Sequence, residues 1–263
     1  TGEKEDWVWD NFGFDPFATN SMLQTAENVA KEAGITTEEQ NEMTLLRYAQ
    51  YQAALADDAA FHRRYMITPI DVTAPSGRKV LASVKDDEGI YPTTHEGLAR
   101  LKPVLDGGTV TYGCQTFPAD GNCGMIVTSA EKARALSRDP QVSVQVLSYA
   151  QGRAKRGYMA QAIVPAARQA LALAGIGIQD VKAIKTHNPF AVNDIYFCRE
   201  MGLKPEQMNN YGSSLIFGHP QGPTGMRLMI ELIEELVLLG GGYGLFDGCA
   251  AGDTAAAVVV KVS

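Results

Sequence analysis

The stretch TGMRLMIELIEELVLLGGG, residues 224–242, predicts one long helix that is stopped by three glycines. Apolar residues lie on more than one of its faces, so we expect the helix to be largely buried and its start to point towards the centre of the fold. Two strongly apolar segments follow, residues 243–252 and 254–262, and they lie close together along the chain. They predict two buried strands that pair as an antiparallel hairpin.

Strand-like and helical segments alternate ahead of this helix. Residues 142–150 and 181–187 are typical of strands, whereas residues 162–175 and 193–202 are typical of helices that end at a glycine. Such an alternation predicts an α/β layered fold with a buried, mostly parallel sheet.

The first half of the chain has a different character. Residues 21–34 and 35–57 predict two helices, the second of which opens with a capping box. Prolines and glycines break residues 62–105 into short pieces with charged flanks, which predicts an irregular, loop-rich region. Residues 108–129 predict two β-like segments around a loop.

Composition and charge exclude several classes of protein. The 263 residues carry a formal net charge of −7, which argues against a general nucleic-acid binder. No apolar run reaches membrane-spanning length, and the acidic, aromatic residues 1–13 do not resemble a signal peptide. The four cysteines form no CxxC pair, so we expect a reduced, cytoplasmic location.

Three short polar motifs lie at predicted strand ends or turns in the second half. They are THNPF (186–190), GHPQGPTG (218–225) and DGCAAGD (247–253). Ligands of open α/β sheets bind outside the carboxyl ends of strands, so we expect all three motifs to reach one crevice. Each also has a structural alternative: a core histidine for His219, a polar residue at a helix start for His187, and a small buried thiol for Cys249.

The order of TAENVA (25–30), GTVTYG (108–113), HNPF, GHPQGPTG and GCAAGD resembles the thiolase family over almost the whole chain. This resemblance implies two similar α/β halves that face each other, with a loop domain inserted in the first. It also implies an acyl-CoA C-acyltransferase of lipid metabolism, which condenses acyl-CoA or cleaves 3-oxoacyl-CoA with CoA. Coenzyme A would then be a substrate, and neither a separate cofactor nor a metal is expected.

The resemblance gives catalytic roles to three residues. His219 is expected to activate the family's nucleophilic cysteine, and Cys249 to move the α-proton of acetyl-CoA. His187 resembles the His-x-x-Phe variant of the sterol-carrier-protein-type thiolases and is expected to hold the thioester oxygen together with His219. A thiolate base needs a lowered pKa, so we expect Asp247 to point away from Cys249.

Further residues are expected to bind the substrate. They are Met22, Arg78, Thr116, Phe117, Phe190 and Ala251. Phe117 is bulky where the family has glycine, so the tunnel for the acyl chain or CoA would have a different shape. Ala251 would offer its N–H to a second oxyanion hole. Arg78, with Lys79, would hold the phosphates of CoA, although a solvated turn explains this pair almost as well.

The resemblance also divides the chain. Residues 1–117 would be the loop domain, residues 118–138 a remnant of the N-terminal thiolase half, and residues 139–263 the C-terminal half. The family's nucleophile lies upstream of the loop domain, and no cysteine here matches its context. We therefore expect the C-terminal two-thirds of a thiolase, inactive as a chain alone.

Two alternatives stay open at this point. A ketoacyl synthase-like condensing enzyme is disfavoured by Cys249, because those enzymes generally place histidine there. A non-catalytic thiolase-like subunit or acyl-CoA-binding scaffold is kept open by the missing nucleophile. The expected partners are acyl-CoA, CoA, further copies of the chain in a dimer or tetramer, and a second chain that carries the N-terminal half or an OB-fold. Neither nucleic acid nor a membrane is expected.

Overall fold

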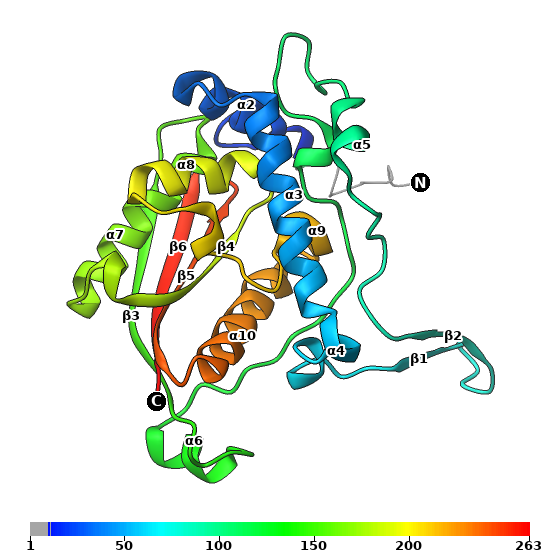
Figure 1. The fold of residues 1–263 in the computed structure, drawn as a ribbon, viewed down its shortest axis with the longest axis vertical. Helices are drawn as coiled ribbons and strands as arrows, with labels where there is room; N and C mark the ends of the chain where they lie inside the picture. Colours follow the sequence, from blue (N-terminus) through cyan, green and yellow to red (C-terminus); the bar gives the residue numbers. More distant parts are fainter. Residues whose placement is uncertain (1–9, 11) are drawn as a thin grey trace.

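The structure is a computed structural model that describes residue 10 and residues 12–263 (Figure 1). Its centre is a four-stranded sheet with the spatial order β3–β6–β5–β4. The strands are β3 (Val144–Arg153), β4 (Val181–His187), β5 (Gly242–Ala250) and β6 (Thr254–Val262). All four lie where the apolar segments predicted strands, which confirms the α/β class.

The sheet is mixed rather than mostly parallel. The predicted hairpin of β5 and β6 is antiparallel, and β3 also pairs antiparallel with β6. Among the described strands, β4 and β5 are the parallel pair. The expectation of a mostly parallel sheet is wrong because residues 251–253 are too short to form the crossover that a parallel connection between β5 and β6 would need.

Helices cover both faces of this sheet (Figure 1). Helix α7 (Ile163–Ala174) packs on β3 and β6, whereas α10 (Gly222–Leu238) packs against β4 and β5. Leu228 and Leu232 of α10 are fully buried, as predicted for the helix that follows the Gly-His-Pro motif. Burial of each such leucine stabilises the fold by about 1.5–3 kcal/mol.

The two predicted N-terminal helices are present as α2 (Met22–Ala33) and α3 (Thr37–Ala54). The predicted capping box joins Thr36 and Glu39 at the start of α3. Both helices contact α8 (Ala191–Met201), and buried residues of α2 belong to the same hydrophobic core as those of β6. The first and second parts of the chain therefore share one core.

The remaining elements are short. They are α4 (Ala56–Ala59), α5 (His95–Ala99), α6 (Ala130–Leu136), α9 (Ser214–Phe217), a hairpin of β1 (Ile70–Thr73) and β2 (Val80–Val84), and 3-10 turns at His62–Arg64, Tyr112–Cys114, Met159–Gln161, Ile178–Asp180 and Pro205–Gln207. This pattern confirms the loop-rich character expected for residues 62–105. No helix in the described part of the chain is long and apolar enough to cross a membrane.

The two β-like segments expected in residues 108–129 are not strands. This stretch holds a 3-10 turn and isolated bridges from Gln115 to Phe190 and from Pro118 to His219. Ile126 and Val127 are 76% and 78% exposed. A strand needs a neighbouring strand for its backbone hydrogen bonds, and the described residues place none beside this segment. The residues before position 10, and residue 11, lie outside the described part.

Candidate functional site

Two histidines meet at the end of the parallel strand pair. His187 is the last residue of β4, and His219 lies just before α10. Their ring centroids are 4.2 Å apart, and the ring planes are tilted by 31°. All three polar motifs were expected to meet in one pocket, with His219 facing Cys249 and His187 beside them, and the ring contact shows this for the two histidines. They lie at the carboxyl end of β4, where ligands of α/β sheets bind.

The Gly-His-Pro backbone fixes the position of His219. Its backbone N–H donates to the Phe117 carbonyl at 2.8 Å, and its Nδ1 lies 2.7 Å from Oγ1 of Thr224 in the first turn of α10. Gly218 has φ +89°, and a Cβ there would lie 2.9 Å from the Phe117 ring. Glycine is thus required both by its backbone conformation and by the close approach of Phe117.

Both imidazoles lie in a poorly solvated environment. Burial lowers the pKa of His219 from its ordinary value to about 4. Burial, and then the neighbouring His219, lower the pKa of His187 well below its ordinary value. The charged form loses hydration in such a place, so both rings are neutral at pH 7. Neutral imidazoles can each donate one hydrogen bond and accept another.

A buried polar cluster that sequence reasoning missed lies behind His187. Ser214 Oγ is 2.8 Å from His187 Nδ1, and Asn188 Nδ2 donates to Asp194 Oδ2 at 2.7 Å. The same carboxylate accepts a 2.7 Å hydrogen bond from Arg47 Nε, which comes from α3. The available signal was the polar run of residues 209–214 ahead of the apolar α9.

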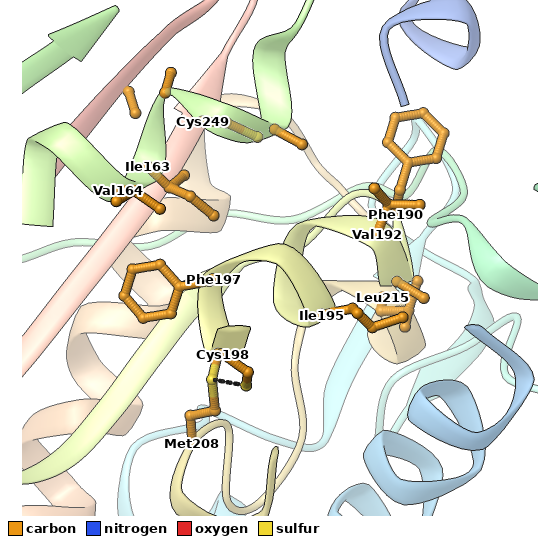
Figure 2. Close-up of a cluster of buried hydrophobic side chains, with 14 of the residues drawn as sticks. Ile163, Val164, Phe190, Val192, Ile195, Phe197, Cys198, Met208, Leu215 and Cys249 are labelled. Carbon is orange, nitrogen blue, oxygen red and sulfur yellow. Dashed lines mark hydrogen bonds between the residues drawn. The ribbon is translucent and has the colours of Figure 1, made fainter. Parts of the chain in front are cut away.

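The side chain of Cys249 points to a different face of the sheet from the side chain of His187. Its neighbour Gly248 pairs with His187 across β4 and β5, and a Cβ on Gly248 would lie 3.2 Å from that of His187. Successive strand residues point to opposite faces, so Cys249 turns to the other face of the sheet. There its Sγ accepts a 3.3 Å hydrogen bond from Asn193, within a buried apolar cluster (Figure 2).

The charge state of Cys249 also differs from the expectation. Burial, and then Asp247, raise the pKa of this thiol to about 12. Asp247 lies two residues earlier on β5 and therefore shares its face, which is why the expectation that Asp247 points away is wrong. The lowered pKa that a thiolate base would need is not found, because burial disfavours the charged form.

The thiols of the other three cysteines do not have a lowered pKa either. Burial is the largest cause that raises the pKa of Cys114 and Cys123, and it raises that of Cys198 to about 12. Cys114 and Cys198 are buried, which agrees with a structural role for both. Within residues 12–263, no group of three His, Cys, Asp or Glu side chains is arranged to hold a metal ion.

Three of the expected substrate-binding residues lie beside the histidines. Gln115 forms a bridge with Phe190, and the Thr116 N–H donates to the Pro189 carbonyl at 2.7 Å. Phe117 follows and accepts the hydrogen bond from His219. Residues 115–118 therefore run between the two histidine motifs.

Met22, Arg78 and Ala251 lie on other elements than the histidine pair. Met22 is buried at the start of α2, and Ala251 is exposed in the turn between β5 and β6. Arg78 is exposed in the loop that joins β1 and β2, a hairpin that projects from the body of the molecule (Figure 1).

The fold and the paired histidines define a layered α/β protein with a polar site at the end of a parallel strand pair. Comparison with known proteins gives its family. The model of the thiolase N-terminal domain matches residues 3–131, and the model of the thiolase C-terminal domain matches residues 140–262. The chain therefore belongs to the thiolase family, and its fold is thiolase-like.

Relatives of known name agree with this assignment. The chain is 32% identical over 252 residues to a 3-ketoacyl-CoA thiolase of Bacillus subtilis, covering 92% of this chain and 63% of the relative. It is 33% identical over 253 residues to the cytosolic acetyl-CoA acetyltransferase of Rattus norvegicus, covering 94% of this chain and 61% of the relative. The chain thus spans less than two thirds of the length of these relatives.

Solved structures give the same result. The acetyl-CoA acetyltransferase of Bacillus anthracis has a TM-score of 0.90 and 29% identity, covering 100% of this chain and 65% of that one. Human mitochondrial 3-ketoacyl-CoA thiolase in complex with CoA has a TM-score of 0.84 and 26% identity, covering 98% of this chain and 63% of that one. A match to the C-terminal part alone is not supported, because the N-terminal domain model also matches. The narrower sterol-carrier-protein-type assignment is not supported either.

Proposed function

We propose that this chain acts as a thiolase-type acyl-CoA C-acyltransferase, which condenses acyl-CoA or cleaves 3-oxoacyl-CoA with CoA as the second substrate. The names of its relatives support this proposal, and the single structural observation that carries it is the pair of imidazoles whose ring centroids lie 4.2 Å apart. The α-proton of a thioester is very weakly acidic. Its removal needs a base and preorganised hydrogen-bond donors at the developing enolate oxygen.

The proposed catalytic residues are His219, His187 and Cys249. The two histidines are close enough to act on one thioester group. The family resemblance gives the α-proton to Cys249. Its burial and its hydrogen bond to Asn193 instead favour a thiol that stays protonated.

The proposed binding residues divide into two groups. Thr116, Phe117 and Phe190 lie beside the histidines and would contact the thioester and pantetheine. The outlying residues Met22, Ala251 and Arg78 would contact more distant parts of the acyl-CoA, with Arg78 at the phosphates. We place the reaction in the lipid metabolism of the cytoplasm, a location supported by the free cysteines and the cytosolic rat relative.

A non-catalytic acyl-CoA-binding subunit is the second candidate. One observation favours it: the pKa of every cysteine thiol in the described part of the chain is raised, so none is prepared to accept an acyl group. Such a subunit would act with further copies of itself, or with a second chain that carries the acyl-accepting cysteine.

Thiolysis of acetoacetyl-CoA by the purified protein, with CoA added, tests the proposal. His219→Gln should lower the rate at least about a hundredfold, because the side chain can no longer transfer a proton. His95→Gln changes an exposed histidine of α5 and serves as the matched control. Binding of acetoacetyl-CoA without any turnover by the native protein would favour the subunit instead, and absence of both would overturn the two candidates together.

A further inference from the structure

A buried charge network connects the loop-rich region to the elements that carry both histidines. It begins at Asp87 in the loop after β2 and continues through Arg227 and Glu231 of α10. It ends at Lys185 of β4, the strand whose last residue is His187. The side chains of Asp87 and Arg227 are 12% and 11% exposed, and the other two are fully buried. Because the signs of charge alternate along the network, each charge has a partner of opposite sign.

Arg227 lies in the middle of the charge network. Its two terminal nitrogens donate to the two carboxylate oxygens of Asp87 at 2.6 and 2.8 Å, and its Nε donates to Glu231 at 3.0 Å. Its guanidinium carbon also lies 3.6 Å from the centre of the Phe217 ring. Arginine can make these contacts together because the guanidinium is planar and holds its donors in a fixed fork, which a lysine ammonium lacks.

Two tyrosines add hydrogen bonds to the carboxylates of the charge network. The Tyr65 hydroxyl donates to Glu231 Oε1 at 2.6 Å, and the Tyr51 hydroxyl donates to Asp87 Oδ2 at 3.2 Å. Lys185 Nζ donates to Glu231 Oε2 at 3.0 Å. No side-chain atom of the network is among the described buried polar atoms that lack a partner. A network satisfied in this way forms a rigid connection between the elements that it joins.

The loop after β2 also reaches the turn at His219 through an aromatic ring. Gly89, which follows Asp87 closely, has φ +78°, and a Cβ there would lie 3.2 Å from the Phe117 ring. The same ring approaches Gly218, and the Phe117 carbonyl accepts the His219 N–H at 2.8 Å. The loop therefore supports this turn by two routes, one through the guanidinium and one through the ring.

We propose that Asp87 and Arg227 are positioning residues that hold the His219 imidazole beside His187, a proposal that rests on the proposed function. Both act through the turn that carries His219 and not through a contact with the substrate. The guanidinium covers Phe217, which stands just ahead of the Gly-His-Pro motif, so loss of its contact with Asp87 lets this turn move. A displacement of about 1 Å at a reacting group can lower a rate about a hundredfold.

The imidazole signals of His219 in the free protein test the positioning without any substrate. Arg227→Lys keeps the positive charge but loses the fork and the stacking on Phe217. In NMR spectra of the ¹⁵N-histidine protein we therefore expect the His219 signals, assigned by their loss in His219→Gln, to shift. The signals of the exposed His95 should stay in place.

Arg64→Lys is the matched control for this substitution. Arg64 also binds α10, through Glu234 at 2.7 Å, but farther along the helix from His219. It should leave the His219 signals unchanged. Asp87→Asn weakens the network from its loop end and should shift them in the same direction as Arg227→Lys, so it provides the test if the arginine variant does not fold. Unchanged His219 signals in either folded variant of the network would overturn the proposal.

Thiolysis of acetoacetyl-CoA distinguishes positioning from substrate binding. We expect Arg227→Lys and Asp87→Asn each to lower kcat about ten- to a hundredfold while KM stays close to its native value, and Arg64→Lys to leave both constants unchanged. The double variant should lose no more than the weaker single variant, because both residues act through one contact. A rise in KM with native kcat would overturn the proposal.

The two experiments also separate this proposal from the proposed function. If the native protein shows no thiolysis and the network variants still shift the His219 signals, the proposed function fails and the placement of the ring by Asp87 and Arg227 stands. If thiolysis occurs and neither the signals nor kcat respond to the network variants, the proposed function stands and the positioning role is wrong.

Discussion

The surroundings of His187 depend on the carboxylate of Asp194, which holds Asn188, the neighbour of Ser214. It accepts hydrogen bonds from Arg47, Asn188 and Thr186, each at 2.7 Å. Arg47 and Asp194 are both fully buried, so each charge relies on the other in place of water. Loss of one partner leaves an uncompensated buried charge, which costs far more than loss of a surface pair.

Arg47→Leu should therefore lower the free energy of unfolding by about 3–5 kcal/mol. Arg168→Leu is the matched control, because Arg168 and Glu200 form an ion pair whose side chains are largely exposed, and its loss should cost less than about 1 kcal/mol. Urea unfolding followed by circular dichroism measures both. Equal effects of the two substitutions would show that the Asp194 cluster does not stabilise the fold.

His219 should make stability depend on pH in the acid range. Its pKa in the folded protein is lowered to about 4 by burial, whereas the unfolded chain has the ordinary value near 6.5. The unfolded state binds more protons between these values, so stability falls as pH drops from about 6.5 to 4, by roughly 3 kcal/mol. Urea unfolding at several pH values should show a smaller fall in His219→Gln. The same fall in this variant and in the exposed control His95→Gln would contradict the assignment.

Among the elements, α10 is held closely against the sheet. Lys185 Nζ of β4 lies 3.0 Å from Glu231 Oε2 of α10, and both side chains are fully buried. A Cβ on Gly244 of β5 would lie 2.7 Å from Leu236 and 3.0 Å from Leu232. The glycine thus sets the distance between the helix that follows His219 and the strand that leads to Cys249.

Gly244→Ala should destabilise the fold by about 1–3 kcal/mol, because the added methyl group overpacks a filled core. Gly222→Ala is the matched control at the exposed start of α10, where a Cβ meets nothing within 4 Å, and it should change stability by less than about 0.5 kcal/mol. Thermal unfolding measures both. A stable Gly244→Ala variant would mean that α10 can move away from the sheet.

The sequence predicted the helices and strands better than it predicted the directions in which individual side chains point. Helical periodicity located α2, α3, α7, α8 and α10, and the order of the polar motifs placed His187 beside His219. The face of Cys249 could not be predicted, because a shift of one residue along a strand reverses the side chain. The hydrogen-bond partner of His187 was also hidden, since Ser214 meets it only in the folded chain.

At the scale of the whole molecule, one hydrophobic core joins the N-terminal helices to the C-terminal sheet. It includes Met22 and Val29 of α2 as well as Ala257 and Val259 of β6. Residues 115–118 pass between the two histidine motifs within this body. The position of the imidazole pair is therefore a property of the complete fold, and neither part of the chain supplies it alone.

The central claim is that the imidazole pair of His187 and His219 forms the site of the proposed acyl-CoA reaction. Deuterium exchange into acetyl-CoA by the His219→Gln protein tests it most directly. We predict that exchange falls at least about a hundredfold, because the imidazole is lost, while the exposed control His95→Gln keeps the native rate. Native exchange in a folded His219→Gln protein that still binds acetyl-CoA would contradict the claim.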